Sequence, residues 1–178
     1  MARIPYLDEA DIPHLSDLVN RIKKGRRGKL LNPYRALLHA PDLGQAWFDF
    51  TNTVRTAGLI DHRLRELIVV LIAKRVRSAY VSGQHIPALA LAAGVTQQEC
   101  DSIIDWRHLA SLSIRERAAL AGAEEMMSCG KMEDATFREI ENHFNRAEQV
   151  ELTIIVGMYD MARLVFDTLE IDPENSSS

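Results

Sequence analysis

Cysteine is scarce in this sequence, and its scarcity excludes a fold held together by disulfides. The chain has 178 residues and contains two cysteines, Cys100 and Cys129. A disulfide framework needs several cysteines at close spacing. We therefore interpret both as reduced, largely structural thiols of a protein in a reducing compartment.

Long apolar runs are also missing, which argues against a membrane protein. No segment reaches the roughly 18 uninterrupted apolar residues that a membrane-spanning helix needs. The first residues turn acidic at Asp8 and Glu9 instead of continuing into the apolar stretch of a signal peptide. We expect a cytoplasmic protein without a membrane partner.

The chain has no surplus of basic charge that would bind nucleic acid. Its 21 lysines and arginines are outnumbered by 25 aspartates and glutamates, and the formal net charge is −4. Binding to nucleic acid depends on a basic surface that contacts phosphates. One basic run, residues 23–29, is local and is more simply a solvated turn. We expect no nucleic-acid partner.

Short metal-binding motifs are absent as well. Histidines recur along the chain, but no two of them have the spacing His-x-x-x-His that places two ligands on one helix face. Nothing in the pattern calls for a metal or an organic cofactor, and we predict neither. The histidines concerned are His39, His62, His85, His108 and His143.

The pattern that is present is helical nearly throughout. No convincing segment alternates apolar and polar residues with a period of two, so strands are not expected. Apolar residues make up 47% of the chain, which is enough for a sizeable core. We predict an all-α fold of about six to nine helices. Residues typical of helix N-caps precede several apolar stretches, and these are Asp61, Thr96, Ser113 and Asn145.

The connecting segments are short, which favours one compact helical domain. We place an N-terminal helical arm and loop at residues 1–41, the helical core at 42–170 and a flexible tail at 171–178. The densest apolar run, residues 67–73, lies in a helix expected from Arg63 to about Arg77. A helix that is apolar around so much of its circumference is normally buried on several sides. Residues 78–84 are expected to interrupt the helical pattern.

Glu66 and His85 are the first candidates for chemistry. They lie on either side of the interruption, which lets the chain reverse and brings the carboxylate and the imidazole together in apolar surroundings. Such a pair supports general acid–base catalysis. A structural role remains the alternative, because a glutamate in a first turn often serves the helix dipole or an ion pair with Arg63 or Arg65. A single histidine is, in addition, more often a packing residue than a catalyst.

The spacing of this pair resembles a known family. Residues 64–67, followed nineteen residues after Glu66 by His85, resemble the signature of the carboxymuconolactone decarboxylase and alkylhydroperoxidase D-like superfamily. The resemblance extends over roughly residues 32–170 and implies an alkylhydroperoxidase D-like helical bundle. The other segments that carry it are residues 32–41, 83–87, 93–95 and 150–153, with Tyr159 and Arg163.

The family's peroxidases carry a Cys-x-x-Cys pair between the glutamate and the histidine, and this chain lacks it. The two positions are occupied by Ser78 and Val81. Peroxide reduction on this scaffold needs one thiolate to attack the O–O bond and a second thiol to resolve the product. The resemblance therefore favours the decarboxylase-like branch, and no thiol peroxidase activity is expected.

The resemblance implies a cofactor-independent lyase or isomerase that acts on a small carboxylated, perhaps lactone-like, compound. In that reaction His85 donates or accepts a proton, Glu66 orients it or shares its proton, and a cation holds the substrate carboxylate. The rival interpretations are an alkylhydroperoxidase-like peroxidase relative and a non-catalytic helical oligomer that binds a small molecule or a partner. The candidate cations are Arg63 and Arg77, which lie on the Glu66 face of one helix, together with Arg35 and Arg163; an ion pair is the alternative role of each.

The resemblance also implies a homo-oligomer, a trimer or a multiple of a trimer. The sequence lends support, because residues 67–73 and residues 152–156 are apolar on several helix faces. A subunit interface would cover apolar surface that one domain of this size leaves exposed.

Overall fold

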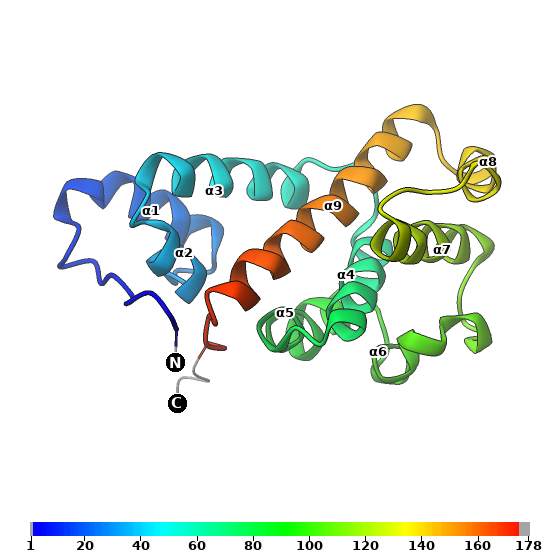
Figure 1. The fold of residues 1–178 in the computed structure, drawn as a ribbon, viewed down its shortest axis with the longest axis horizontal. Coiled ribbons are helices and arrows are strands. Elements are labelled where there is room, and N and C mark those ends of the chain that lie inside the picture. The colour runs from blue at the N-terminus through cyan, green and yellow to red at the C-terminus, as the bar shows by residue number, and fades with distance from the viewer. Residues whose placement is uncertain (1, 175–178) are drawn as a thin grey trace. The chain divides into compact units, whose positions relative to one another are not determined.

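The computed structural model describes residues 2–174, and within them every regular element is helical (Figure 1), which confirms the predicted all-α class. The last four residues of the predicted flexible tail, 175–178, lie outside the described part. A 3-10 helix precedes α1, a π-helical segment follows α5 and a second 3-10 helix follows α6. The helices in chain order are α1 Ser16–Gly25, α2 Asn32–Leu37, α3 Pro41–Thr56, α4 His62–Val76, α5 Ala79–Gln84, α6 Gln97–Ser102, α7 Ile114–Cys129, α8 Asp134–His143 and α9 Arg146–Thr168.

The chain forms two compact units. One contains the residues up to Ala57 together with those from Val165 onward, and the other runs from Gly58 to Leu164. Helix α9 begins in the second unit and contributes its last residues to the first. The arm, core and tail expected at 1–41, 42–170 and 171–178 stay a prediction.

The first unit has an apolar core built by α1, α2 and α3. Ile22 and Leu38 are buried there together with Phe48, whose ring meets that of Tyr34 edge to face at 6.0 Å. The guanidinium of Arg26 is buried over both rings and donates a hydrogen bond of 3.0 Å to the Tyr34 hydroxyl. The cation is thus desolvated against aromatic faces, where cation–π attraction is strongest.

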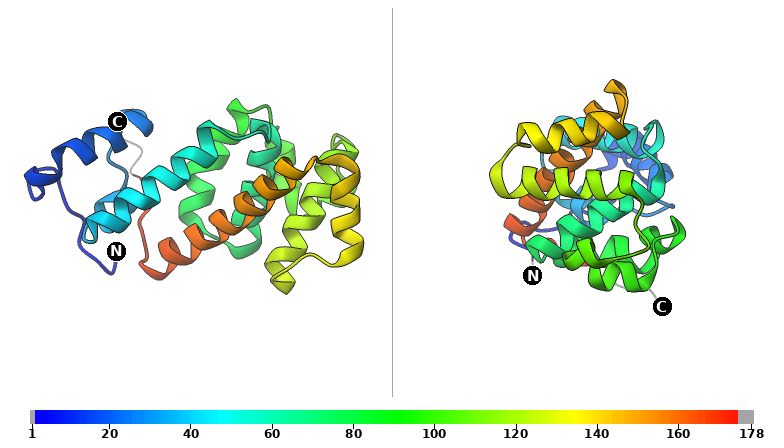
Figure 2. Two further views of the ribbon diagram at one scale, coloured as in Figure 1. Left: turned by 90° about the horizontal axis from the view of Figure 1, so that it is seen from above. Right: turned by 90° about the vertical axis from the view of Figure 1, so that its right-hand side faces the viewer.

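The second unit is organised around α4. All ten side chains from Leu64 to Ala73 are buried, and for residues 67–73 the dense apolar run predicted this burial. Helices α5 and α7 and the π-helical segment pack around it, and the two views of Figure 2 show α4 among these neighbours. Glu66 is therefore held in a rigid helix at the centre of the unit.

The predicted N-caps are confirmed. The Asp61 carboxylate accepts a hydrogen bond of 2.9 Å from the Leu64 amide at the start of α4. Thr96 and Ser113 form capping boxes with Glu99 and Glu116, and Asn145 accepts hydrogen bonds from the first amides of α9. These local contacts set where each helix begins and hence which side chains face the core.

The interruption expected over residues 78–84 is much shorter than predicted. Arg77 adopts a left-handed conformation with φ of 57° and Ser78 is extended, after which α5 restarts the helix at Ala79. The Ser78 amide donates back to the Ala73 carbonyl at 3.0 Å, which closes the end of α4. Two residues therefore suffice for the reversal.

Candidate functional site

Glu66 and His85 meet in the core of the second unit. The Nδ1 atom of His85 lies 2.7 Å from Oε2 of Glu66, and the two side chains are 8% and 3% exposed. The reversal at Arg77 and Ser78 turns α5 back against α4, and His85 follows directly after α5. The structure thus brings together the two residues that the sequence singled out, although their role in catalysis stays a prediction.

His85 opens a π-helical segment, His85–Ala90. A π-helical turn holds more residues than an α-turn, and such turns are frequent at functional sites. Ile86 and Pro87 follow directly, and proline has no amide hydrogen to donate to a regular helix. The irregular backbone places the imidazole at the start of the segment, where it faces α4.

Two further side chains lie against the pair. The Nε atom of Arg65 is 3.6 Å from Oε1 of Glu66, the oxygen that does not face His85. The ring of Tyr159, from α9, meets the imidazole edge to face with centroids 5.3 Å apart. Arg65 places a buried positive charge beside the carboxylate, and Tyr159 restricts the orientation of the imidazole.

The geometry defines which imidazole nitrogen can react. When Nδ1–H donates to the Glu66 carboxylate, the neutral ring carries its lone pair on Nε2. The anion opposite Nδ1 also stabilises the ring after Nε2 takes up a proton. The pair is therefore arranged for His85 to accept and return a proton through Nε2, with Glu66 fixing its tautomer.

Arg63, a predicted substrate-binding residue, is engaged by two glutamates. Its guanidinium donates to both carboxylate oxygens of Glu99, at 2.6 and 3.0 Å, and to Glu116 at 2.8 Å. These hydrogen bonds raise the pKa of Arg63, and in return the guanidinium lowers the pKa of the Glu99 carboxyl to about 2. The structure gives Arg63 a bridging role between helices.

Of the remaining predicted cations, one is exposed at a helix end and two form ion pairs with aspartates. Arg77 is exposed at the end of α4, and Arg163 forms an ion pair of 2.8 Å with Asp160 one turn earlier in α9. Arg35 belongs to the first unit, where it forms an ion pair with Asp8. Their part in substrate binding stays a prediction.

The two positions of the missing cysteine pair are both buried. Ser78 is 1% exposed and Val81 is 3% exposed. Cys100 is buried elsewhere, and burial raises the pKa of its thiol, which keeps the thiol protonated. Cys129 is exposed at the end of α7. The two cysteines are both free and form no disulfide with each other.

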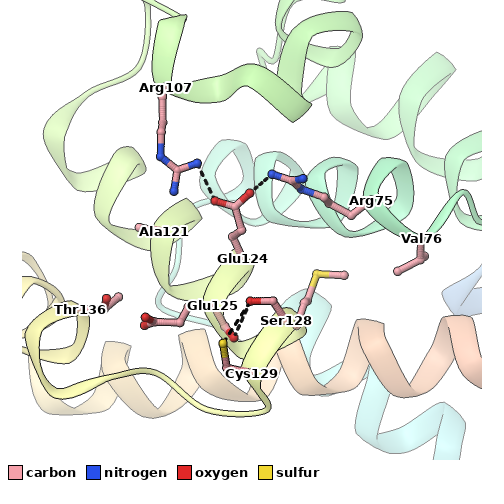
Figure 3. Close-up of a pocket in the computed structure, with 10 residues that line it drawn as sticks. Arg75, Val76, Arg107, Ala121, Glu124, Glu125, Ser128, Cys129 and Thr136 are labelled. Carbon is pink, nitrogen blue, oxygen red and sulfur yellow. Dashed lines mark hydrogen bonds and ion pairs between the residues drawn. The ribbon is translucent and has the colours of Figure 1, made fainter.

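An open cleft of about 600 Å³ lies beside Cys129, at one side of α7 (Figure 3). Glu124 extends into it and forms ion pairs with Arg75 and with Arg107, the second of them 2.7 Å long. The hydroxyl of Ser128 lies 3.5 Å from the Cys129 sulfur. Sequence reasoning missed this cleft, because its walls come from separate helices that no local motif connects.

Two broader properties of the described residues bear on function. Over residues 2–174, no group of three or more histidine, cysteine, aspartate or glutamate side chains is arranged to hold a metal ion. No helix in the same part of the chain has the length and apolar character required to cross a bilayer.

Comparison with known proteins points to one superfamily. Residues 41–125 match the model of the carboxymuconolactone decarboxylase family. No curated protein matches the chain in sequence. The match includes Glu66 and His85 and ends within α7.

Solved structures share the fold over nearly the whole chain. The apo debrominase Bmp8 superposes with a TM-score of 0.79 at 18% identity, over 96% of this chain and 91% of the debrominase. A peroxidase-related protein with an alkylhydroperoxidase core from Ralstonia eutropha gives 0.82 at 19% identity, over 98% and 93%. A peroxidase-related protein from Silicibacter gives 0.80 at 20% identity, over 97% and 90%. At such identities the likeness establishes the fold and leaves the reaction open.

Proposed function

The chain belongs to the carboxymuconolactone decarboxylase and alkylhydroperoxidase D-like superfamily, and we propose that it is a cofactor-independent lyase or isomerase with Glu66 and His85 as its proton-transfer pair. The substrate class that we propose is a small carboxylated, lactone-like compound. The observation that carries the proposal is the buried 2.7 Å contact between Nδ1 of His85 and Oε2 of Glu66.

The proposed reaction uses the imidazole as a reversible proton carrier. Nε2 of His85 removes a proton from a carbon of the substrate and returns it to another carbon, which shifts a double bond. In a decarboxylation the C–C bond to the carboxylate breaks, CO₂ leaves, and the electron pair that stays on carbon takes the proton from Nε2–H. Glu66 supports both steps because its charge stabilises the protonated imidazole.

A thiol peroxidase is the disfavoured alternative. Its chemistry needs a thiolate at the positions where this chain carries Ser78 and Val81. The debrominase named above binds 2,3,4-tribromopyrrole in one of its structures. No contact within residues 2–174 favours a brominated substrate. A non-catalytic helical oligomer is the remaining alternative, in which the Glu66–His85 contact serves packing.

A substrate screen tests the proposal. Purified protein is incubated with carboxylated lactones and related ring-cleavage acids, and CO₂ release and ultraviolet absorbance are followed. We expect conversion of at least one compound by the wild type and a strong loss in the His85→Ala protein. Conversion that is equally fast in a folded His85→Ala protein would rule out the proposed mechanism.

A further inference from the structure

Helix α9 carries a second apolar stripe on the face opposite its buried one. The buried face presents Leu152, Ile155 and Val156 to the core of the second unit. Four large apolar side chains on the other face remain exposed. These are Val150 at 61%, Ile154 at 39%, Met161 at 39% and Leu164 at 49%.

The spacing of the exposed stripe is that of a helix-pairing surface. Its members follow one another at intervals of four, three, four and three residues once Gly157 is included. This alternation keeps all five positions on one side of the helix and is the pattern of paired helices. Single exposed apolar residues are ordinary, but five positions in register along four turns form a continuous surface.

Gly157 is placed where another backbone could approach. A Cβ atom built on it meets nothing within 4 Å, so no neighbour within the described structure requires a glycine there. A glycine inside a helix costs about 0.5–1 kcal/mol relative to alanine. Close approach of a second helix would account for this residue, because the missing side chain lets two helix backbones come near.

We propose that the α9 stripe pairs antiparallel with the same stripe of a second copy of this chain, about a two-fold axis at Gly157. The stripe is symmetric about that residue: Val150 and Leu164 each lie seven residues from it, and Ile154 and Met161 lie three and four residues from it. A two-fold axis therefore sets Val150 against the partner's Leu164 and Ile154 against the partner's Met161. Such self-complementarity is what an interface between identical subunits requires.

The polar edge of the stripe obeys the same symmetry. Thr153 and Asp160 lie together on one side of it, and the two-fold axis brings the Thr153 of each copy beside the Asp160 of the other. Within one chain the hydroxyl donates to the Gln149 carbonyl at 2.9 Å and the carboxylate accepts from Arg163 at 2.8 Å, so pairing exchanges the first of these bonds for one to the partner's carboxylate. Apolar positions thus meet apolar positions and a donor meets an acceptor, which a partner of unrelated sequence would match only by coincidence.

The contact also constrains the size of the assembly. A two-fold interface cannot occur within a trimer, whereas two trimers joined by such contacts form a hexamer. The expectation of a multiple of a trimer and the α9 pairing are therefore compatible in an assembly with an even number of subunits.

Crosslinking tests the pairing directly. Gly157→Cys is made in a Cys129→Ser protein, and the matched control is Glu141→Cys, at an exposed position on α8. Under mild oxidation we expect disulfide-linked dimers from Gly157→Cys and far fewer from the control, because the two-fold axis holds the two thiols within bonding distance. Equal or absent crosslinking in the two proteins overturns the proposal.

Light scattering gives a second, independent readout. Ile154→Glu with Met161→Glu is expected to lower the molar mass by at least a factor of two and to leave the helical circular dichroism unchanged. The control is Phe137→Glu, which alters an apolar side chain of nearly equal exposure, 38%, away from the stripe. If the double variant keeps its mass and instead loses thermal stability, another part of the same chain covers the stripe and the proposal fails.

Discussion

Two buried carboxylates of the second unit, Glu66 and Glu99, differ in the partners that surround them. Both side chains are 3% exposed. Glu99 accepts hydrogen bonds from an arginine and from uncharged donors, whereas Glu66 lies between an imidazole at 2.7 Å and the Arg65 guanidinium at 3.6 Å. The donors to Glu99 are the two terminal nitrogens of Arg63, the amide and hydroxyl of Thr96, and the hydroxyl of Ser111.

The proposed function makes Glu99 a structural carboxylate and Glu66 a reacting one, a difference that the equal burial of the two side chains does not reveal. Permanent donors hold Glu99 ionised and leave it no proton to exchange, so its contribution is to stability. The contact between Glu66 and His85 instead joins a carboxylate to a ring that can both donate and accept a proton, as the proposed reaction requires. The predictions below test this assignment, from the largest expected effect to the smallest.

The largest effect is expected on stability when the Glu99 cluster loses its cation. Arg63→Met leaves a buried carboxylate without its opposite charge, which typically costs about 3–5 kcal/mol in free energy of unfolding. Urea unfolding measures the loss. The control is Arg163→Met, whose ion pair with Asp160 lies within one helix and is expected to contribute less than about 0.5 kcal/mol. A raised KM with unchanged stability in Arg63→Met would instead assign Arg63 to substrate binding.

The next effect concerns turnover at the Glu66–His85 pair. His85→Ala or Glu66→Gln should each reduce kcat by about a hundredfold, or about 2.7 kcal/mol in barrier height, because the proton carrier or its anion is lost. The double variant should lose little more than either single one, since the two residues act as one unit. Steady-state rates with the substrate found by screening measure this. Multiplicative losses would show that the residues act separately.

A smaller effect on the free energy of unfolding is expected when the pH is lowered. The folded pKa of Glu99, about 2, lies below its ordinary value of 4.5, so its contribution to stability is present above about pH 4.5 and is lost as the pH falls towards 2. The wild type should therefore lose about 2 kcal/mol relative to Glu99→Gln between about pH 5 and about pH 3. Parallel urea titrations of the two proteins measure the difference, and a constant difference across this range would contradict the assignment.

Replacing the cysteines is expected to have no effect on turnover. Cys129→Ser and Cys100→Ser should leave turnover unchanged, because neither thiol contacts Glu66 or His85 among the described contacts. Neither protein should reduce peroxide with a dithiol reductant. Peroxide turnover that either substitution abolishes would restore the peroxidase alternative.

Local signals predicted much of the fold. The caps at Asp61, Thr96 and Ser113 are contacts over three residues, so the sequence contains both partners side by side. The burial of residues 67–73 followed from their unbroken apolar character. The meeting of Glu66 and His85 was predicted because the interruption between them lets the chain reverse and because their spacing resembles the family signature.

Other features could not be predicted because their causes are distant in sequence or lack a clear pattern. Helix α5 contains Ser82 and Gly83, which are poor helix formers, and packing against α4 maintains it. Pro87 disfavours a regular helix after His85 but does not specify a π-helical turn. Arg63 was a candidate for substrate binding because it lies on the Glu66 face of its helix. Its partners Glu99 and Glu116 come from later helices, and only folding brings them to it.

The guanidinium of Arg63 joins the beginnings of three helices. It lies near the start of α4, and its two carboxylate partners are the capping-box glutamates of α6 and α7. None of these helix ends can open without disturbing the hydrogen bonds of the other two. Their first turns should therefore exchange amide hydrogens as one cooperative unit, with a common opening free energy. A region assembled from segments more than fifty residues apart would then fold and unfold as a single element.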